Sequence, residues 1–297
     1  MIDYVKRAFY KPNWKLAVRE LNEDVDSVYD FIEAKNEYNA YITEGKYWCA
    51  DPFIIRVDDS IYVFCEYCTN GSDKGTIAVG EYKNGVISKM RIIIEQGYHM
   101  SYPCVFKYGS DFFMIPETAD NKTIELYRAK IFPYEWELAK ILKENVRCVD
   151  PTVFTNNDEI FVIASMLSGK KNKICIFQLD MEYNSLTLSD EFDDDGTGRP
   201  AGSIIFIDKK LFRPAQVSTR KYGESIAFKE IISVRNTYHE KTIAKLQGRN
   251  ILVKGEQKVD RIHTFNRIGN VEIMDYSIDS FELTRPLKLI IRKLTQF

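Results

Sequence analysis

The sequence predicts an all-β fold, a five-bladed β-propeller with four-stranded antiparallel blades. Two observations carry this prediction. One pattern of residues occurs five times along the 297-residue chain, at three intervals of about fifty residues and a last interval of 64, from residue 199 to residue 263. Each recurrence contains two aromatic or β-branched strands joined by a short polar turn, and it leaves room for two further strands. A repeat of this length, built from four strands, is typical of a propeller blade.

Each repeat opens with a polar or aromatic residue, usually followed by proline, and then an apolar strand. The openings are Asp51-Pro52, Tyr102-Pro103, Asp150-Pro151, Arg199-Pro200 and His263-Thr264. The turns that follow are "VDDS", "YGSD", "TNNDE", "IDKK" and "RIGN", which are rich in residues that form hairpin connections. The fifth repeat matches the pattern least well, because it lacks the proline.

The remaining segments fit the same architecture. Residues 75–88 predict a third strand, a turn and a fourth strand, and residues 122–143, 171–190 and 224–243 repeat this pattern. A strand over residues 13–21 would complete the last blade and close the ring, which removes exposed sheet edges. We expect a short helix or loop over residues 26–38 and a final strand over 281–294, within a single domain of residues 1–297. An irregular β-sandwich would also suit aromatic strands, but the steady spacing favours the propeller.

Composition excludes several classes of partner. The formal net charge is −2 and no dense Lys/Arg block exists, so no nucleic-acid partner is expected. Residues 1–20 lack the apolar core of a secretory signal, and no apolar run suits a transmembrane segment, so the expected location is cytoplasmic. Cys65-x-x-Cys68 has no second pair at zinc spacing, and the acidic residues 190–198 lack the terminal Glu of a calcium loop. We therefore expect buried thiols, no metal and no cofactor.

The residues that open the repeats form the first candidate site. The first strand of each propeller blade lines the central channel, so these residues converge on one region. They are Asp51, Tyr102, Asp150, Arg199 and His263. A proline that follows holds the preceding residue in an extended conformation. A single Asp-Pro often merely begins a strand, but two in register with a phenol, a guanidinium and an imidazole indicate a polar ligand site.

Further polar residues follow the second strands of the repeats. Glu66 and Glu117 end these strands in the first two repeats, although Glu66 would also suit a solvated strand end. In the fourth repeat the candidates are Arg213, Gln216, Arg220, Tyr222 and Glu224. Because "RPAQ" at Arg213 repeats "RPAG" at Arg199, we expect the two guanidiniums to lie near one another. Paired guanidiniums suit bidentate recognition of a carboxylate or a phosphate.

The two Asp-Pro openings resemble those of five-bladed glycosidases of the arabinanase and β-xylosidase type. The resemblance implies that Asp51 is the general base and that Asp150 orients and tunes the acid. The general acid of these enzymes is a glutamate that opens the fourth blade, where this sequence has Arg199. Arginine does not give up its proton, so an inverting hydrolase would need another acid, and Glu117 and Glu224 are the candidates.

A longer run of motifs resembles the domain at the N-terminus of plant glucosamine inositolphosphorylceramide transferases, which also occurs in stand-alone bacterial proteins. The motifs are "WCADPF", "HMSYPCVF", "FMIPET", "FPYEWEL", "VDPTVF", "RPAGSIIF", "LFRPAQ" and "YGESI", and they cover about residues 46–230. The plant proteins continue into a separate glycosyltransferase domain, for which this chain is too short. The resemblance therefore implies a carbohydrate-related propeller without transferring the plant activity.

Three functions stay open. The first is an enzyme that transfers a glycosyl group or cleaves it with phosphate, with Asp51 or Asp150 as the base. Arg199, Arg213 and Arg220 would then hold a sugar-phosphate or nucleotide-sugar, and Tyr102 and His263 would bind sugar hydroxyls. The second is hydrolysis with Glu117 or Glu224 as a displaced acid. The third is a non-catalytic sugar-binding propeller, which the 18 Tyr and 18 Phe would suit.

Overall fold

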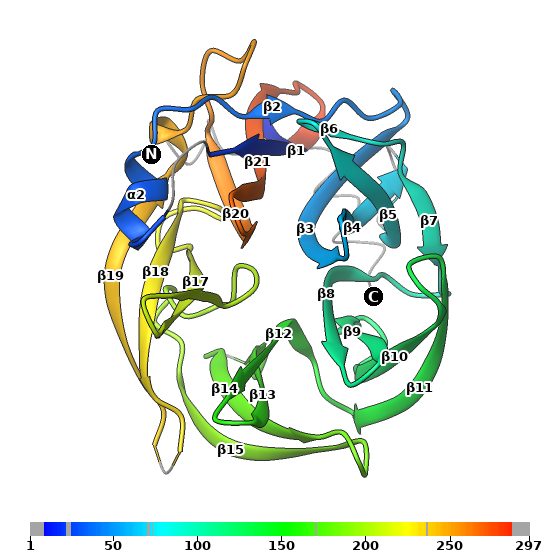
Figure 1. Cartoon of the computed structure of the whole chain (residues 1–297). Coiled ribbons are helices and arrows are strands. Elements are labelled where there is room, and N and C mark those ends of the chain that lie inside the picture. Colours follow the sequence, from blue (N-terminus) through cyan, green and yellow to red (C-terminus); the bar gives the residue numbers. More distant parts are fainter. Residues whose placement is uncertain are drawn as a thin grey trace.

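Five antiparallel sheets stand in a closed ring, so the prediction of an all-β, five-bladed propeller is confirmed (Figure 1). The computed structural model describes residues 9–21, 25–69, 72, 74–169, 171–235 and 237–286. Within this part of the chain four blades have four strands each, and the first blade has a fifth short strand on its outer side.

The strands follow the chain blade by blade. Blade one contains β3 (Tyr47–Val57), β4 (Ser60–Thr69), β5 (Thr76–Lys83), β6 (Val86–Ile87) and β7 (Arg91–Ile94). Blade two contains β8 (Ser101–Tyr108), β9 (Asp111–Glu117), β10 (Thr123–Ile131) and β11 (Glu135–Glu144). Blade three contains β12 (Cys148–Asn156), β13 (Glu159–Met166), β14 (Lys173–Asp180) and β15 (Ser185–Asp193). Blade four contains β16 (Ile205–Ile207), β17 (Lys210–Val217), β18 (Ser225–Ser233) and β19 (His239–Gln247), followed by the 3-10 helix η1 (Gly248–Asn250).

Blade five is built from both ends of the described chain. It contains β20 (Arg261–Ile268) and β21 (Val271–Phe281) together with β1 (Tyr10–Glu20) and β2 (Asn39–Ala40). β1 pairs with β21 along its whole length, from Tyr10 opposite Phe281 to Glu20 opposite Val271. The strand expected over residues 13–21 is β1, and its pairing leaves no open edge between the first and last blades.

Tight two-residue turns join the first two strands of the blades. In blade three, Asn157 and Asp158 both have positive φ, 48° and 64°, and in blade four Asp208 and Lys209 have 45° and 58°. Positive φ at both central residues defines the turn whose twist matches that of antiparallel strands, which explains the Asn- and Asp-rich turn sequences.

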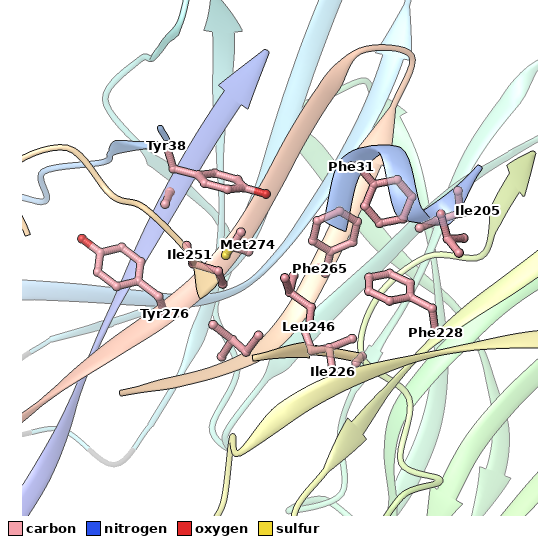
Figure 2. Packing of buried hydrophobic residues seen from close by; sticks show 14 of the residues in the cluster. Phe31, Tyr38, Ile205, Ile226, Phe228, Leu246, Ile251, Phe265, Met274 and Tyr276 are labelled. Carbon is pink, nitrogen blue, oxygen red and sulfur yellow. The ribbon is translucent and has the colours of Figure 1, made fainter. Parts of the chain in front are cut away.

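A short helix, α2 (Val28–Glu33), packs beside blades four and five. The Asp30 carboxylate accepts the Ser27 N–H at 2.8 Å, which caps the first turn. The buried Arg19 guanidinium of β1 donates to the carbonyls of Phe31 and Ala34 at the other end. Figure 2 shows the Phe31 ring among apolar side chains of both blades, near Phe228 and Phe265. Its ring centroid lies 5.1 Å from that of Phe228 and 5.3 Å from that of Phe265. The segment predicted as a helix or loop is therefore a helix in its first half.

The expected C-terminal strand over residues 281–294 is wrong where the structure describes it. β21 ends at Phe281, and the Arg285 N–H donates to the Glu282 carbonyl at 3.2 Å, a turn bond in place of strand pairing. Residues 287–294 of this prediction lie outside the described residues.

Two findings concern the sequence's thiols and its apolar segments. All six cysteines are free and buried, as expected for Cys65 and Cys68. Among the described residues, no helix is both long enough and apolar enough to cross a membrane.

Candidate functional site at the propeller axis

Four first strands share a β-bulge at the residue that opens each repeat. The pairing with the second strand is interrupted after Ala50, Ser101, Val149 and Ile262. At three of these bulges, Asp51, Tyr102 and Asp150 adopt φ values of 50°, 49° and 53°. The extended conformation expected before proline is therefore wrong for these residues, because the bulge inserts a residue that must turn to rejoin the strand. Left-handed backbone at non-glycine residues costs free energy and is concentrated at functional sites.

Blade four reaches the same region by a different path. The Gln216 N–H donates to the Arg199 carbonyl at 2.7 Å, and the positive φ falls on Gly202, at 125°. A Cβ atom at Gly202 would lie 2.0 Å from the Phe265 carbonyl oxygen, so only glycine fits at this crossing of blades four and five.

Asp51 is buried, with 5% of its surface exposed, and its two carboxylate oxygens differ in their partners. Oδ1 accepts the Thr264 hydroxyl at 2.7 Å and lies 3.3 Å from Nε2 of His263. Within the described part of the chain, Oδ2 has no hydrogen-bond partner. Burial raises the pKa of Asp51 to about 6, although the His263 charge opposes the shift. Asp51 is thus oriented through one oxygen and open at the other.

Asp275 of β21 organises the fifth-blade side of the cluster. Its Oδ1 accepts the backbone N–H groups of His263 and Thr264, and its Oδ2 accepts that of Asp51 at 2.9 Å. The same Oδ2 lies 2.7 Å from Nδ1 of His263. Burial opposes protonation of His263, but the Asp275 and Asp51 carboxylates outweigh it and raise the pKa of His263 to about 9. His263 is therefore an imidazolium ion at neutral pH and holds Asp51 in place.

Asp150, in contrast, has both oxygens occupied. Arg199 donates to it through two guanidinium nitrogens, with Nη2 3.0 Å from Oδ1, and Gln216 Nε2 donates to Oδ2 at 2.8 Å. Asp150 is 1% exposed. The repeat openings of blades three and four therefore form a bidentate ion pair with each other.

Glu117 lies beside this pair at the end of β9. Its Oε2 accepts the Asp150 N–H at 3.2 Å and lies 3.7 Å from Nη2 of Arg199, and its side chain is 13% exposed. Burial and the neighbouring Asp150 charge hold the pKa of Glu117 well above its usual range, against the opposing effect of Arg199. These surroundings favour the protonated form of the Glu117 carboxyl group.

Glu66, at the equivalent place on β4, is also buried rather than solvated, with 5% exposure. Burial first, and then the Asp51 charge, raise its pKa to about 8. Cys68 Sγ lies 3.3 Å from its Oε1, and Nε2 of His99 lies 3.5 Å from the same oxygen. His99 accepts the Gly75 N–H through Nδ1 at 2.9 Å, so its proton is on Nε2 and faces Glu66.

Two aromatic side chains border the cluster. The Trp14 ring of β1 lies 4.1 Å, centroid to centroid, from the His263 ring, and Tyr222 lies 5.1 Å from His263 with 40% of its surface exposed. The Arg199 guanidinium is 5.8 Å from the Tyr222 ring centroid, a cation–π distance. The predicted site residues Asp51, Asp150, Glu117, Arg199, Gln216, Tyr222 and His263 are thus connected through neighbouring contacts at the propeller axis.

The side chain of Tyr102 does not face a ligand. It is 0% exposed, and its hydroxyl accepts the Gly202 N–H at 2.6 Å and lies 2.8 Å from the Thr152 hydroxyl. The prediction that Tyr102 binds substrate is corrected, because its phenol ties blades two, three and four together inside the protein.

Arg213 is likewise not a substrate ligand. Its guanidinium is 0% exposed, pairs with both carboxylate oxygens of Glu240 at 2.7–2.8 Å, and donates to the Gly198 carbonyl. The expected pair of guanidiniums is wrong, because the alternation of side chains along β17 directs Arg213 to β19 while Arg199 pairs with Asp150.

Glu224 and Arg220 form an ion pair with each other in the loop between β17 and β18, where 77% of the Arg220 side chain is exposed. The Arg220 hydrogen bond holds the pKa of Glu224 below its usual range. A general acid needs a raised pKa, so the prediction that Glu224 could serve as the general acid is corrected.

Sequence reasoning missed several participants: Trp14, His99, Thr264 and Asp275, and it left Glu66 undecided. His99 had a signal, since it lies in the motif "HMSYPCVF". For Asp275 the only signal in the sequence was its position directly after the apolar stretch "VEIM". Glu117 has the same kind of position, directly after "FMIP". Trp14 had none, because its contact with His263 depends on ring closure.

The described residues include one group whose donor atoms lie close enough to hold a cation, Asp51, His263 and Asp275, within 4.8 Å of one another. These atoms already engage one another, the Thr264 hydroxyl and backbone N–H groups. We interpret the group as a network of paired charges that positions Asp51.

This fold defines a class of protein, the five-bladed propellers. Solved structures with the same fold include an α-L-arabinofuranosidase from Podospora anserina, with a TM-score of 0.60 and 11% identity over 79% of this chain and 91% of that one. The Bacillus subtilis arabinanase has a TM-score of 0.54 and 14% identity over 77% of this chain and 93% of that one. At such identities the likeness shows the fold alone.

The chain belongs to the family described as "Glucosamine inositolphosphorylceramide transferase 1, N-terminal", which matches residues 37–267. Glucosamine inositolphosphorylceramide transferase 1 from Oryza sativa subsp. indica is 28% identical over 207 residues, 64% of this chain and 27% of the relative. The Arabidopsis thaliana protein is 28% identical over 204 residues, 61% of this chain and 25% of the relative. The chain therefore matches about a quarter of the length of these plant relatives, and the family resemblance seen in its motifs is confirmed.

Proposed function

We propose that this protein cleaves or transfers a glycosyl group at the axial cluster, with Asp51 as the base and protonated Glu117 as the acid. One observation carries the proposal, the contrast between the two repeat-opening aspartates. Asp150 uses both oxygens on Arg199 and Gln216, whereas Asp51 keeps Oδ2 unpartnered within the described chain. Asp51 can accept a proton on Oδ2 without displacing a hydrogen-bond donor, whereas Asp150 would have to release Arg199 or Gln216.

The protonation states support the same assignment. With a pKa of about 6, Asp51 is mostly a carboxylate at neutral pH, while burial and the Asp150 charge raise the pKa of Glu117 and favour its protonated form. Two carboxyl groups whose surroundings separate their pKa values are the usual basis for assigning base and acid. Asp51 would take the proton of an attacking hydroxyl as its oxygen bonds to the anomeric carbon. Glu117 would give its proton to the departing oxygen as the glycosidic bond breaks.

The charge of the cluster favours a neutral or cationic sugar over a nucleotide-sugar. Arg199 is neutralised by Asp150, and Arg213 and Arg220 have their own partners. Even with Glu66 and Glu117 protonated, the cluster holds more negative than positive groups. Its three carboxylates belong to Asp51, Asp150 and Asp275, and its two cations to Arg199 and His263. The plant relatives are named glucosamine inositolphosphorylceramide transferases, and the ammonium group of glucosamine suits such a surplus of negative charge.

The proposal is tested by incubating the protein with a panel of nitrophenyl glycosides, including glucosaminides, with water or added sugars as acceptors. Asp51→Asn and Glu117→Gln should each lower kcat/KM by about 10²- to 10⁴-fold. Glu224→Gln, which changes only the loop partner of the largely exposed Arg220, should stay within about twofold of the parent. Full activity in Asp51→Asn would overturn the assignment of the base.

A second candidate is a non-catalytic sugar-binding propeller. It is favoured by Arg199, which stands where related folds are expected to carry the acid, and by the low exposure of Asp51. The test is NMR of saccharides that have been incubated with the protein for a prolonged time. Saccharides that bind and stay chemically unchanged would favour this candidate over the enzyme.

A further inference from the structure

A groove with an aromatic lining lies beside the axial cluster, between blades five and one. Its volume is about 430 Å³, within the usual range of small-ligand sites. Trp14, Tyr41, Tyr47 and Trp48 supply the aromatic surface, and all four rings are half-buried. We refer to it below as the aromatic groove.

The aromatic groove adjoins the axial cluster through Trp14. This side chain lines the groove and also lies 4.1 Å, centroid to centroid, from the His263 ring. Trp48 lies on β3, the same strand as Asp51. A chain of linked units with one end at Asp51 could therefore continue along the groove without leaving the protein surface.

The chemistry of the lining fits sugar rings. Tyr47 is fixed by stacking on Tyr67, with centroids 4.6 Å apart, and the Tyr41 hydroxyl is fixed by the Met90 N–H at 3.2 Å. Rigid aromatic faces pack against the apolar faces of sugars at little entropic cost. On the rim, Lys15 and Glu256 form an ion pair at 2.7 Å, with 35% and 21% of their side chains exposed. These groups can also form hydrogen bonds with sugar hydroxyls, whereas an acyl chain offers no hydrogen-bonding group in return.

We propose that the aromatic groove binds the sugar units next to the reacting one, so that the protein takes a saccharide chain rather than a single sugar. This rests on the proposed function only in placing the reacting unit at the axial cluster. The aromatic stacking adds affinity for each further unit, and the axial cluster selects the terminal one.

The test measures binding, so that it does not depend on turnover. Titration of the protein with glucosamine and with glucosamine oligomers of two to six units, followed by calorimetry, gives affinity against length. Cello-oligosaccharides serve as the neutral series. We expect affinity for the tetramer to exceed that for the monomer by about tenfold or more. Trp48→Ala should remove this gain and leave monomer affinity unchanged, and Trp48→Phe should restore part of it.

Tyr183→Ala is the matched control, because Tyr183 is 71% exposed and lies in the hairpin of blade three. Glu256→Gln keeps the shape of the rim and should weaken only the oligomers, which guards against a misfolded Trp48 variant. Equal affinity for all lengths in the parent protein would overturn the inference, as would equal loss of monomer and oligomer binding in Trp48→Ala. If binding depends on oligomer length but no saccharide is turned over, the groove binds sugar units and the proposed enzyme activity is wrong. If saccharides are turned over but affinity does not depend on length, the enzyme activity stands and the inference about the groove is wrong.

Discussion

Substituting Tyr102 by Phe removes one hydroxyl that joins three blades. The hydroxyl accepts the Gly202 N–H at 2.6 Å and pairs with the Thr152 hydroxyl at 2.8 Å, with no exposed surface. Thr152 keeps a weak bond to the Asp150 carbonyl at 3.5 Å, but no other partner of the Gly202 N–H is seen among the described residues. A buried polar group without a partner costs about 1–3 kcal/mol, and the lost hydrogen bond to Thr152 costs about 1 kcal/mol more, so the variant should lose about 2–4 kcal/mol of unfolding free energy.

Urea unfolding followed by tryptophan fluorescence measures this loss, and Tyr183→Phe is the control. Tyr183 is 71% exposed, so its variant should stay within about 0.5 kcal/mol of the parent. Saccharide affinity of the folded Tyr102→Phe protein should be unchanged, because the hydroxyl faces the interior. Unchanged stability together with lost affinity would show that Tyr102 binds ligand and that the structural role assigned here is wrong.

Three further predictions concern charge. The pH profile of kcat/KM should rise up to about pH 6 as Asp51 loses its proton and fall once Glu117 loses its own; a flat acidic limb would contradict the assignment. Glu66 has a folded-state pKa of about 8 against an ordinary 4.5, so the folded protein holds this proton longer than the unfolded chain and loses stability as pH rises between these values. Relative to the parent, Glu66→Gln should therefore gain roughly 2–4 kcal/mol between pH 5 and 8 in denaturant titrations, and a pH-independent difference would refute the shift. Arg213→Met should cost about 2–4 kcal/mol of stability by leaving Glu240 without its bidentate partner, with saccharide binding intact; lost binding at full stability would return Arg213 to the site.

The fold was predictable because each repeat carries its own local signal. Turn residues such as Asn157 and Asp158 specify tight hairpins, and the openings at Asp51 and Asp150 mark the first strands. The regular spacing of these signals determines the number of blades without any knowledge of long-range contacts.

The partners within the site were less predictable, because they depend on the direction of each side chain. Arg199 and Arg213 share the motif Arg-Pro-Ala, yet one meets Asp150 at the axis and the other meets Glu240 between strands. Asp275 has no distinctive motif, and its role follows from a contact 224 residues away along the chain. Periodicity predicts which residues start a strand, but the bulge that turns Asp51 through positive φ is visible only in three dimensions.

The ring closure by β1 also sets the order in which the site can form. The Asp51 N–H, near the start of the chain, meets the Asp275 carboxylate of the strand that pairs with β1. During synthesis β1 emerges long before β20 and β21. The edge of β1 that pairs with β21 therefore has no partner strand until the end of the chain has been made. Trp14, Asp51 and His263 come together only when the last blade is completed. An incompletely folded chain therefore lacks the assembled axial cluster, which forms in the same step that closes the ring.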